Sequence, residues 1–130
     1  MAPVAYTCYN FFMRETQRKG DTAVAQAVAT FTRLGFDVAY PLTESASYDL
    51  IVDLGKELKR VQVKFASNKD VDLRRVHSNS KGYVVNKTKK NSYDWLYVLK
   101  NTGEEYLLKQ CLHNRRAVRP REEHLLKKVT

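Results

Sequence analysis

The spacing of hydrophobic positions predicts one long helix near the start of the chain. Within residues 15–34, apolar side chains recur every three or four positions, at Val24, Ala27, Val28, Phe31 and Leu34. This spacing places them along one face of an amphipathic α-helix. Gly35 follows at once, where a left-handed residue commonly ends a helix. We therefore expect a helix over residues 15–34, then a short strand over residues 36–40 that Pro41 ends.

Residues 47–67, with the sequence SYDLIVDLGKELKRVQVKFAS, predict a β-hairpin. Gly55 and Lys56 stand between two apolar runs and suit the two-residue loop of a type II′ turn. We expect Leu54 to face Glu57 across this turn. That pairing fixes the register of both strands.

The register brings polar side chains together on one face of the hairpin. Asp49 is expected opposite Gln62, and Lys64 is the diagonal neighbour two positions on. The other face is apolar and is expected to receive the helix. It carries Tyr48, Leu50, Val61, Val63 and Phe65.

Beyond the hairpin, polar and apolar segments follow one another. Residues 69–91 are polar and basic and indicate a loop with at most a short strand at residues 83–85. Residues 93–100 and 105–110 predict two strands rich in β-branched and aromatic side chains, joined by a turn. Residues 119–129 predict a short closing helix. This order of elements predicts an α/β fold with a mixed central β-sheet flanked by helices.

Composition favours one domain with a polyanionic partner. The chain has 130 residues, of which 43% are hydrophobic, and this suffices for one core, so we expect a single domain over residues 1–130. The 23 Lys and Arg residues against 14 Asp and Glu give a net charge of +9. Such an excess favours nucleic acid as the partner. A need for solubility and a basic helix on a membrane surface are the alternative explanations.

The cysteines indicate a reducing environment inside the cell. Cys8 and Cys111 form neither a disulfide framework nor a metal-binding spacing. Residues 1–13 are apolar but lack a basic start and a long hydrophobic run, so we expect neither a signal peptide nor a membrane span. A cytoplasmic location without a membrane partner is the expectation.

The polar group of Asp49, Gln62 and Lys64 has two interpretations. It is either a solvent-facing patch of the sheet or part of a functional site. Residues 50–52, LIV, run together without alternation, which is typical of a strand covered on both sides. A charge beside such a strand requires a partner or a metal ion.

Three stretches of the chain resemble the PD-(D/E)xK nuclease superfamily. They are RKGD at residues 18–21, GFDVAYPLTESASYDLIVD at residues 35–53 and KRVQVKFAS at residues 59–67. Over this half of the chain, the sequence is most similar to the small homing endonucleases associated with group I introns. The resemblance implies a restriction-endonuclease-like core and a metal-dependent endonuclease that hydrolyses phosphodiester bonds in duplex DNA.

The resemblance also implies roles for four residues. Asp49 would bridge to Mg²⁺ or Mn²⁺, and Gln62 would occupy the second acidic position of the motif. The peptide carbonyl of Val63 would be a further metal ligand. Lys64 would be the motif lysine, which positions the attacking water and offsets negative charge. These residue types suit Mg²⁺, which prefers oxygen ligands that include one or two carboxylates.

Two positions depart from the family pattern. Gln62 stands where Glu or Asp is usual, and it offers only a neutral carbonyl oxygen. The helix position that often carries Glu in this superfamily is Val24 here. Either Glu44 or Asp21 would have to supply the missing carboxylate. We favour Glu44 because it lies on the loop that leads to Asp49.

Basic residues after the motif are expected to contact DNA, where they would track phosphates or enter a groove. They are Arg74, Arg75, Lys81, Lys87, Lys89 and Lys90. A chain with one active site needs a homodimer or a higher symmetric oligomer to cut both strands. Three alternatives remain open: a nuclease resembling Holliday-junction resolvases, a catalytically silent nucleic-acid-binding domain of the same fold, and a basic structural protein without a site.

Overall fold

The computed structural model describes residues 15–79 and 81–126. Its elements are α2 (Glu15–Arg33), β1 (Asp37–Ala39), β2 (Leu50–Asp53), β3 (Leu58–Ala66), β4 (Val71–Asp72), β5 (Arg75–Asn79), β6 (Gly82–Asn86), β7 (Trp95–Lys100), β8 (Glu105–Leu108), β9 (Ala117–Val118) and the 3₁₀ helix η2 (Glu122–His124). The expected first helix and the strands expected at residues 36–40, 93–100 and 105–110 are therefore confirmed. The apolar residues 1–13 lie outside the described part of the chain.

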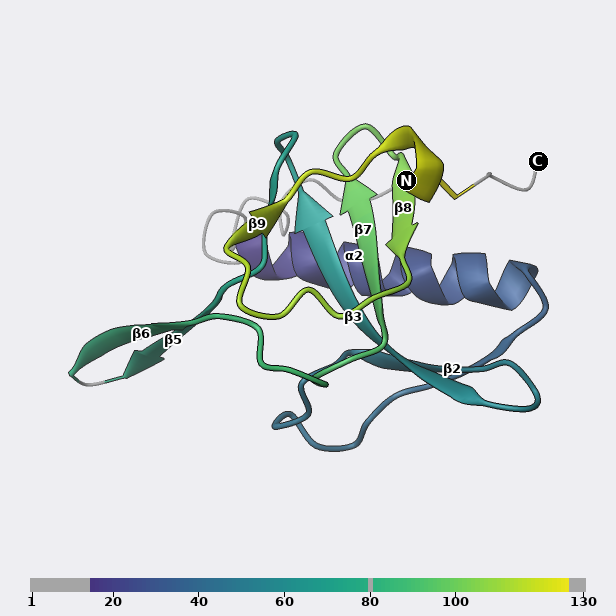
Figure 1. Ribbon diagram of the computed structural model, residues 1–130, viewed down its shortest axis with the longest axis horizontal. Helices are drawn as coiled ribbons and strands as arrows, with labels where there is room; N and C mark the ends of the chain where they lie inside the picture. The colour runs from purple at the N-terminus through teal and green to yellow at the C-terminus, as the bar shows by residue number, and fades with distance from the viewer. Residues whose placement is uncertain (1–14, 80, 127–130) are drawn as a thin grey trace, which may run out of the picture.

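A mixed five-stranded sheet forms the centre of the molecule, in the order β1-β2-β3-β7-β8. Strands β3 and β7 are parallel, whereas the other neighbours are antiparallel. Helix α2 crosses one face of the sheet, and the short β4–β9 pair lies on the other (Figure 1). The predicted α/β class is confirmed. In the described residues, no helix is both long enough and apolar enough to cross a membrane.

Small side chains allow α2 to pack closely on the sheet. Ala23, Ala27 and Phe31 are fully buried along one face of the helix. They share one apolar cluster, the helix-side core, with buried side chains of β2, β3, β7 and β8. Burial of a side chain such as Phe31 contributes about 1.5–3 kcal/mol. Gly35 ends the helix with a φ of 94°, the left-handed conformation that the sequence predicts there.

The β2–β3 hairpin has the predicted register. Leu54 donates its N–H to the Glu57 carbonyl at 2.9 Å, and Leu50 lies opposite Val61. Gly55 between them has a φ of 92°, which glycine adopts without a steric penalty. The chemistry of this turn therefore decides which residues of the two strands face each other.

Tyr48 lies on the opposite side of the sheet from the one expected. It packs against the apolar cluster on the face away from α2, and the Arg60 guanidinium lies 5.9 Å from the centroid of its ring. The prediction that Tyr48 faces the helix together with Leu50 is wrong. The backbone bends at Asp49, so the alternation of side chains does not continue beyond the start of β2.

After β9 the described chain is mostly extended. Past η2, Leu125 forms an isolated antiparallel bridge with Tyr106, and Leu126 donates its N–H to the Glu105 carbonyl at 2.9 Å. The prediction of a closing helix over residues 119–129 is therefore wrong for the described residues up to 126. The Leu126 N–H bonds to the edge strand β8, whereas the Leu125 N–H bonds to the Glu122 carbonyl of the single 3₁₀ turn at 3.0 Å.

Residues 75–86 form a second hairpin, which we call the β5–β6 ribbon. Its strands pair from Arg75 opposite Asn86 to Asn79 opposite Gly82. The ribbon projects from the body at one end of the molecule (Figure 1). The short strand expected at residues 83–85 is confirmed within β6, whereas the loop expected before it is wrong at residues 75–79, which form β5. The sequence RVHSN of β5 lacks the regular apolar alternation that identifies a half-buried strand.

A buried carboxylate ties α2 to the sheet. Glu105 is 4% exposed and accepts hydrogen bonds from the Tyr97 hydroxyl at 2.7 Å and from the Thr30 hydroxyl of α2. The side-chain amide of Gln26 lies 3.5 Å from its second oxygen. Burial, together with the Glu105 acceptor, raises the pKa of Tyr97. Polar contacts therefore join the helix to the sheet beside the apolar core.

We predict that Glu105→Ala lowers the free energy of unfolding by about 2–4 kcal/mol, because the buried Tyr97 hydroxyl and the Thr30 hydroxyl lose their acceptor. Glu104→Ala is the matched control, since Glu104 is the exposed neighbour and its loss should cost no more than about 0.5 kcal/mol. Urea unfolding followed by circular dichroism measures both variants. Equal losses would show that the buried network does not stabilise the fold.

Candidate active site

Asp49 is held where strand β2 begins. Its N–H donates to the Val61 carbonyl at 2.9 Å, and its Oδ2 accepts the N–H of Val63 at 2.8 Å. The regular ladder stops at Leu50 opposite Val61, so the expectation that Asp49 directly faces Gln62 is wrong. The bend instead aims the carboxylate at the backbone in the middle of β3.

The bond between Asp49 and Val63 also locates a second oxygen. The N–H and C=O of one strand residue point toward the same neighbouring strand. Because the Val63 N–H points to Asp49, the Val63 carbonyl points to the same side, beyond the end of the β2 ladder. The Val63 side chain points out of the plane of the sheet on the side of α2, and it is 8% exposed in the helix-side core. A carboxylate and a backbone carbonyl on one side of β3 form a donor pair that suits a hard cation.

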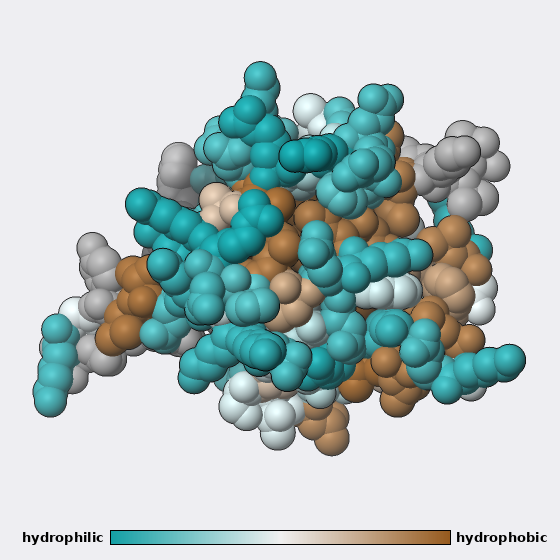
Figure 2. Space-filling model, in the orientation of Figure 1, coloured by the Kyte–Doolittle hydropathy of each residue, from teal (hydrophilic) through white to brown (hydrophobic). Residues whose placement is uncertain are grey.

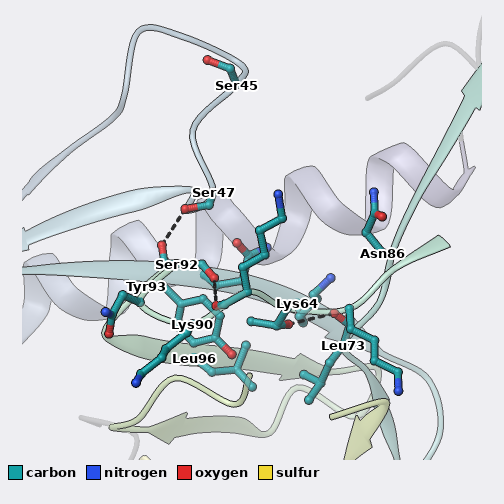
Figure 3. Close-up of a pocket in the computed structure, with 14 residues that line it drawn as sticks. Ser45, Ser47, Lys64, Leu73, Asn86, Lys90, Ser92, Tyr93 and Leu96 are labelled. Atoms are coloured by element: carbon teal, nitrogen blue, oxygen red, sulfur yellow. Dashed lines mark hydrogen bonds between the residues drawn. The ribbon is translucent and has the colours of Figure 1, made fainter. Parts of the chain in front are cut away.

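Gln62 and Lys64 line a cavity of about 420 Å³ on the sheet face away from α2 (Figure 3). They lie opposite Leu96 and Val98 of β7, which belong to the apolar cluster of that face. The rest of the wall consists of Ser45, Ser47, Leu73, Tyr93, Leu96 and the loop of residues 86–92.

Every charged side chain that lines this cavity is basic. They are Lys64, Lys87, Lys89 and Lys90. Like charges around a partly enclosed space add up to a positive potential that attracts anions. The cavity is therefore suited to a phosphate group and to its neighbours along a nucleic-acid strand.

Glu44 and Asp49 lie beside the cavity. Both line a shallow pocket of about 220 Å³. Residues 45–47 run between the two spaces, since Ser45 and Ser47 line the cavity whereas Ala46 lines the pocket. The structure therefore brings the predicted site residues together as two pairs. Asp49 and Glu44 line the shallow pocket, and Gln62 and Lys64, the sequence neighbours of Val63, line the cavity.

Helix α2 does not bring a carboxylate to the position that the resemblance implies. Val24 packs against the helix-side core. Asp21 is exposed and belongs to the helix that covers the opposite face of the sheet. Among residues 15–79 and 81–126, no group of three His, Cys, Asp or Glu side chains is placed to hold a metal ion. A cation bound by these residues would rely on a mixture of carboxylate, amide and backbone oxygens.

Arg60 anchors the wall of the cavity. Its Nε and Nη2 each lie 3.2 Å from an oxygen of Asp94, and its Nη1 donates to the Asn91 carbonyl at 2.8 Å. Nearby, the Ser47 hydroxyl donates to the Ser92 carbonyl at 2.6 Å (Figure 3). These bonds fix the loop that carries the cavity lysines.

The sequence pattern did not predict this anchor. One signal for Arg60 was available, because it stands two residues before Gln62 and so belongs to the same face of β3. Nothing in the sequence singled out Asp94, which reaches Arg60 only through the parallel pairing of β3 with β7. The hydrogen bond from Arg60 holds the pKa of Asp94 below its ordinary value.

The other residues expected to contact DNA lie outside the cavity. Arg74 forms an ion pair with Asp72 at 2.9 Å, and the hydrogen bond from Arg74 lowers the pKa of Asp72 to about 2. Arg75 begins the β5–β6 ribbon, and the exposed Lys81 stands at its turn. The six basic residues between positions 74 and 90 are thus separated in space: Lys87, Lys89 and Lys90 line the cavity, Arg75 and Lys81 belong to the ribbon, and Arg74 lies outside both.

Comparison with known proteins decides the family. Residues 14–122 match the PD-(D/E)XK endonuclease family. The chain belongs to the PD-(D/E)XK endonuclease family. This finding confirms the resemblance that the three sequence stretches indicate, and it supports nuclease function.

A solved structure agrees with this assignment. The structure of a bacterial homing endonuclease, I-Ssp6803I, is similar to this PD-(D/E)XK endonuclease with a TM-score of 0.67 and 25% sequence identity. The similarity covers 82% of this chain and 78% of that chain. No match was found among curated proteins. The mixed sheet with its covering helix is therefore shared with a nuclease of known structure.

We predict that Asp94→Asn makes the stability of the protein less sensitive to acid. The pKa of Asp94 in the folded protein lies below its ordinary value of 3.8. The ionised Asp94 therefore stabilises the fold above pH 3.8, and this stabilisation is lost as the pH falls through the lowered folded-state pKa. Both partners are about one-third exposed, and solvent screening limits the effect to about 0.5–1 kcal/mol. Urea unfolding at a series of pH values between neutral and strongly acidic measures it.

Arg60→Gln provides the matching test from the other partner. It should reduce the acid sensitivity as Asp94→Asn does, because either change removes the ion pair. If the free energy of unfolding of both variants fell with decreasing pH as steeply as that of the wild type, the role of this pair in anchoring the cavity wall would be contradicted.

Proposed function

We propose that this chain is a metal-dependent endonuclease that hydrolyses phosphodiester bonds in duplex DNA, as a site-specific homing endonuclease does. The proposal rests on the hydrogen bond between Asp49 and Val63, which sets a carboxylate beside the strand whose neighbouring residues line a lysine-rich cavity. The similarity to I-Ssp6803I supports the homing activity.

The residues present fit Mg²⁺ or Mn²⁺. Asp49 would supply a carboxylate oxygen, Val63 its backbone carbonyl and Gln62 its side-chain amide oxygen, and all three are the hard donors that these ions prefer. Glu44 would add a second carboxylate from the pocket that it shares with Asp49. A divalent ion held by these residues would supply a bound water of lowered pKa and would polarise the scissile phosphate.

Lys64 would act from the cavity side of the same strand. Its ammonium group would offset the negative charge that develops on the phosphate oxygens and would orient the attacking water through an N–H donor. The cavity lysines of the 86–92 loop would neutralise the adjacent phosphates and keep the DNA backbone in the cavity. Arg60 would hold this loop in place without touching the reacting atoms.

Contacts to the DNA backbone would come from basic residues of the cavity wall, of the β5–β6 ribbon and of the segment that leads into it. They are Arg74, Arg75, Lys81, Lys87, Lys89 and Lys90. A homodimer or a higher symmetric oligomer would bring two such sites to the two strands, with its two-fold axis relating the half-sites of the target.

We predict that Asp49→Ala and Asp49→Asn each reduce metal-dependent DNA cleavage by about 10³-fold or more. Asp49→Asn keeps an oxygen acceptor for the Val63 N–H and removes only the negative charge. Its effect therefore separates the chemistry from the folding of the strand. The measurement is nicking and linearisation of a DNA library that contains candidate target sites, in Mg²⁺, in Mn²⁺ and in EDTA.

Asp37→Ala is the matched control for this experiment, because Asp37 is an exposed carboxylate on β1 and lines neither the cavity nor the shallow pocket. It should cut DNA as the wild type does, and all variants should still bind DNA in EDTA. A folded Asp49→Asn protein with full activity would rule out this site. Binding without cutting in every metal would favour a catalytically silent DNA-binding domain.

Lys64→Ala is predicted to slow cleavage by about 10²–10³-fold, since one charge that stabilises the transition state is lost. Lys59→Ala serves as its control. Lys59 belongs to the same strand but pairs with Glu57 at 3.3 Å, away from the cavity. Single-turnover cleavage rates compare the two, and equal losses would mean that only the overall positive charge matters.

A further inference from the structure

The β5–β6 ribbon exposes an apolar side chain on each face. Val84 and Val85 are 51% and 45% exposed, and consecutive residues of a strand point to opposite faces. Figure 2 shows an apolar patch on this projecting ribbon. A two-stranded ribbon is only marginally stable by itself in water. A partner that covers an exposed apolar side chain of the ribbon would therefore stabilise it.

The charge around the ribbon identifies the class of this partner. Every charged residue in the segment of residues 73–93 is Arg or Lys. Arg75 lies at the root of the ribbon, Lys81 at its turn and Lys87 directly after its last strand. At the ribbon itself a second copy of this segment would bring charges of the same sign, whereas a polyanion such as DNA brings charges of the opposite sign and is attracted.

The ribbon begins at the wall of the candidate active site. Asn86 is the last residue of β6, and together with Lys87 it lines the cavity that contains Gln62 and Lys64. DNA with a phosphate in that cavity would continue past the root of the ribbon. This step rests on the proposed function, since it takes the cavity as the place of the scissile phosphate.

The dimensions of the ribbon fit the major groove. Its strands have five residues each, which corresponds to a length of about 17 Å at about 3.3 Å per residue. The major groove of B-DNA, about 12 Å wide and 8.5 Å deep, admits a two-stranded β-ribbon. The 5-methyl group of thymine is the apolar feature that base pairs present there.

We propose that the β5–β6 ribbon enters the major groove beside the cleavage site and that the valine on the face turned toward the bases, Val84 or Val85, contacts thymine methyl groups. The ribbon would then contribute sequence preference, whereas the lysines of the cavity contribute binding to phosphates. Minor-groove binding would not engage these methyl groups, because they project into the major groove.

Binding in EDTA tests this proposal without any cleavage. The probes are a fluorescent duplex of alternating adenine and thymine and the same duplex with uracil in place of thymine, which lacks only the methyl groups. We expect the wild type to bind the thymine duplex about fivefold more tightly by fluorescence anisotropy. Val84→Ser/Val85→Ser should bind both duplexes equally, because the variant has no apolar contact to lose.

Leu58→Ser is the control, since Leu58 is another exposed apolar strand residue, 60% exposed, at the far hairpin. It should keep the preference for thymine. A second variant replaces residues 76–85 by Asn-Gly between Arg75 and Asn86, which lie opposite one another and can be closed by such a two-residue turn. This shortened variant should also bind both duplexes equally, and circular dichroism should show an intact fold.

Two results would overturn the proposal. One is a wild type that does not distinguish the duplexes. The other is a valine or shortened variant that keeps the preference, and if that variant also changes the sedimentation of the free protein, the ribbon is assigned to contacts between copies of the chain. A wild type that prefers the thymine duplex but cuts no DNA in Mg²⁺ or Mn²⁺ would instead refute the proposed function and leave the ribbon assignment standing.

Discussion

The hydrogen bond from the Val63 N–H to Asp49 Oδ2 is the contact on which the candidate site depends. In a continuous hairpin this N–H would bond to a backbone carbonyl of the opposite strand. Here the chain bends at Asp49, and the side-chain carboxylate takes the place of that carbonyl. The exchange satisfies a backbone donor of a buried residue and fixes the carboxylate against the centre of the sheet. A charged acceptor also makes the bond stronger than a neutral one would.

Strand β3 joins the core to the site because its residues alternate between two environments. Val61 and Val63 are buried against α2, whereas Gln62 and Lys64 line the cavity on the other face. Packing of the helix therefore holds the polar residues of the same strand in position. The parallel neighbour β7 supports the strand along its length, and the ion pair between Arg60 and Asp94 secures the loop that completes the cavity. The site is built on rigid elements, with the β5–β6 ribbon as the projecting part.

Local chemistry made much of this arrangement predictable. The turn at Gly55 fixed the register of the hairpin, and helical spacing identified α2 with its buried Phe31. The errors arose where distant contacts override local pattern. Tyr48 lies on the other face because the strand bends, and Leu125 is extended because it pairs with β8. The ion pair between Arg60 and Asp94 joins residues far apart in the sequence, and the alternation of side chains along a single strand does not predict such a pair.

Family membership and a solved relative support nuclease function. The central claim is that Asp49, Gln62 and Val63 hold the divalent ion that we propose for this function. The most direct measurement is a titration of the DNA-free protein with Mn²⁺, followed by paramagnetic broadening of its backbone amide NMR signals. The signals of Asp49, Gln62, Val63 and Lys64 are predicted to broaden first, and Asp49→Asn should abolish this order. Broadening that starts elsewhere, for example at the exposed Glu122 and Glu123, with no response from β3, would contradict the claim.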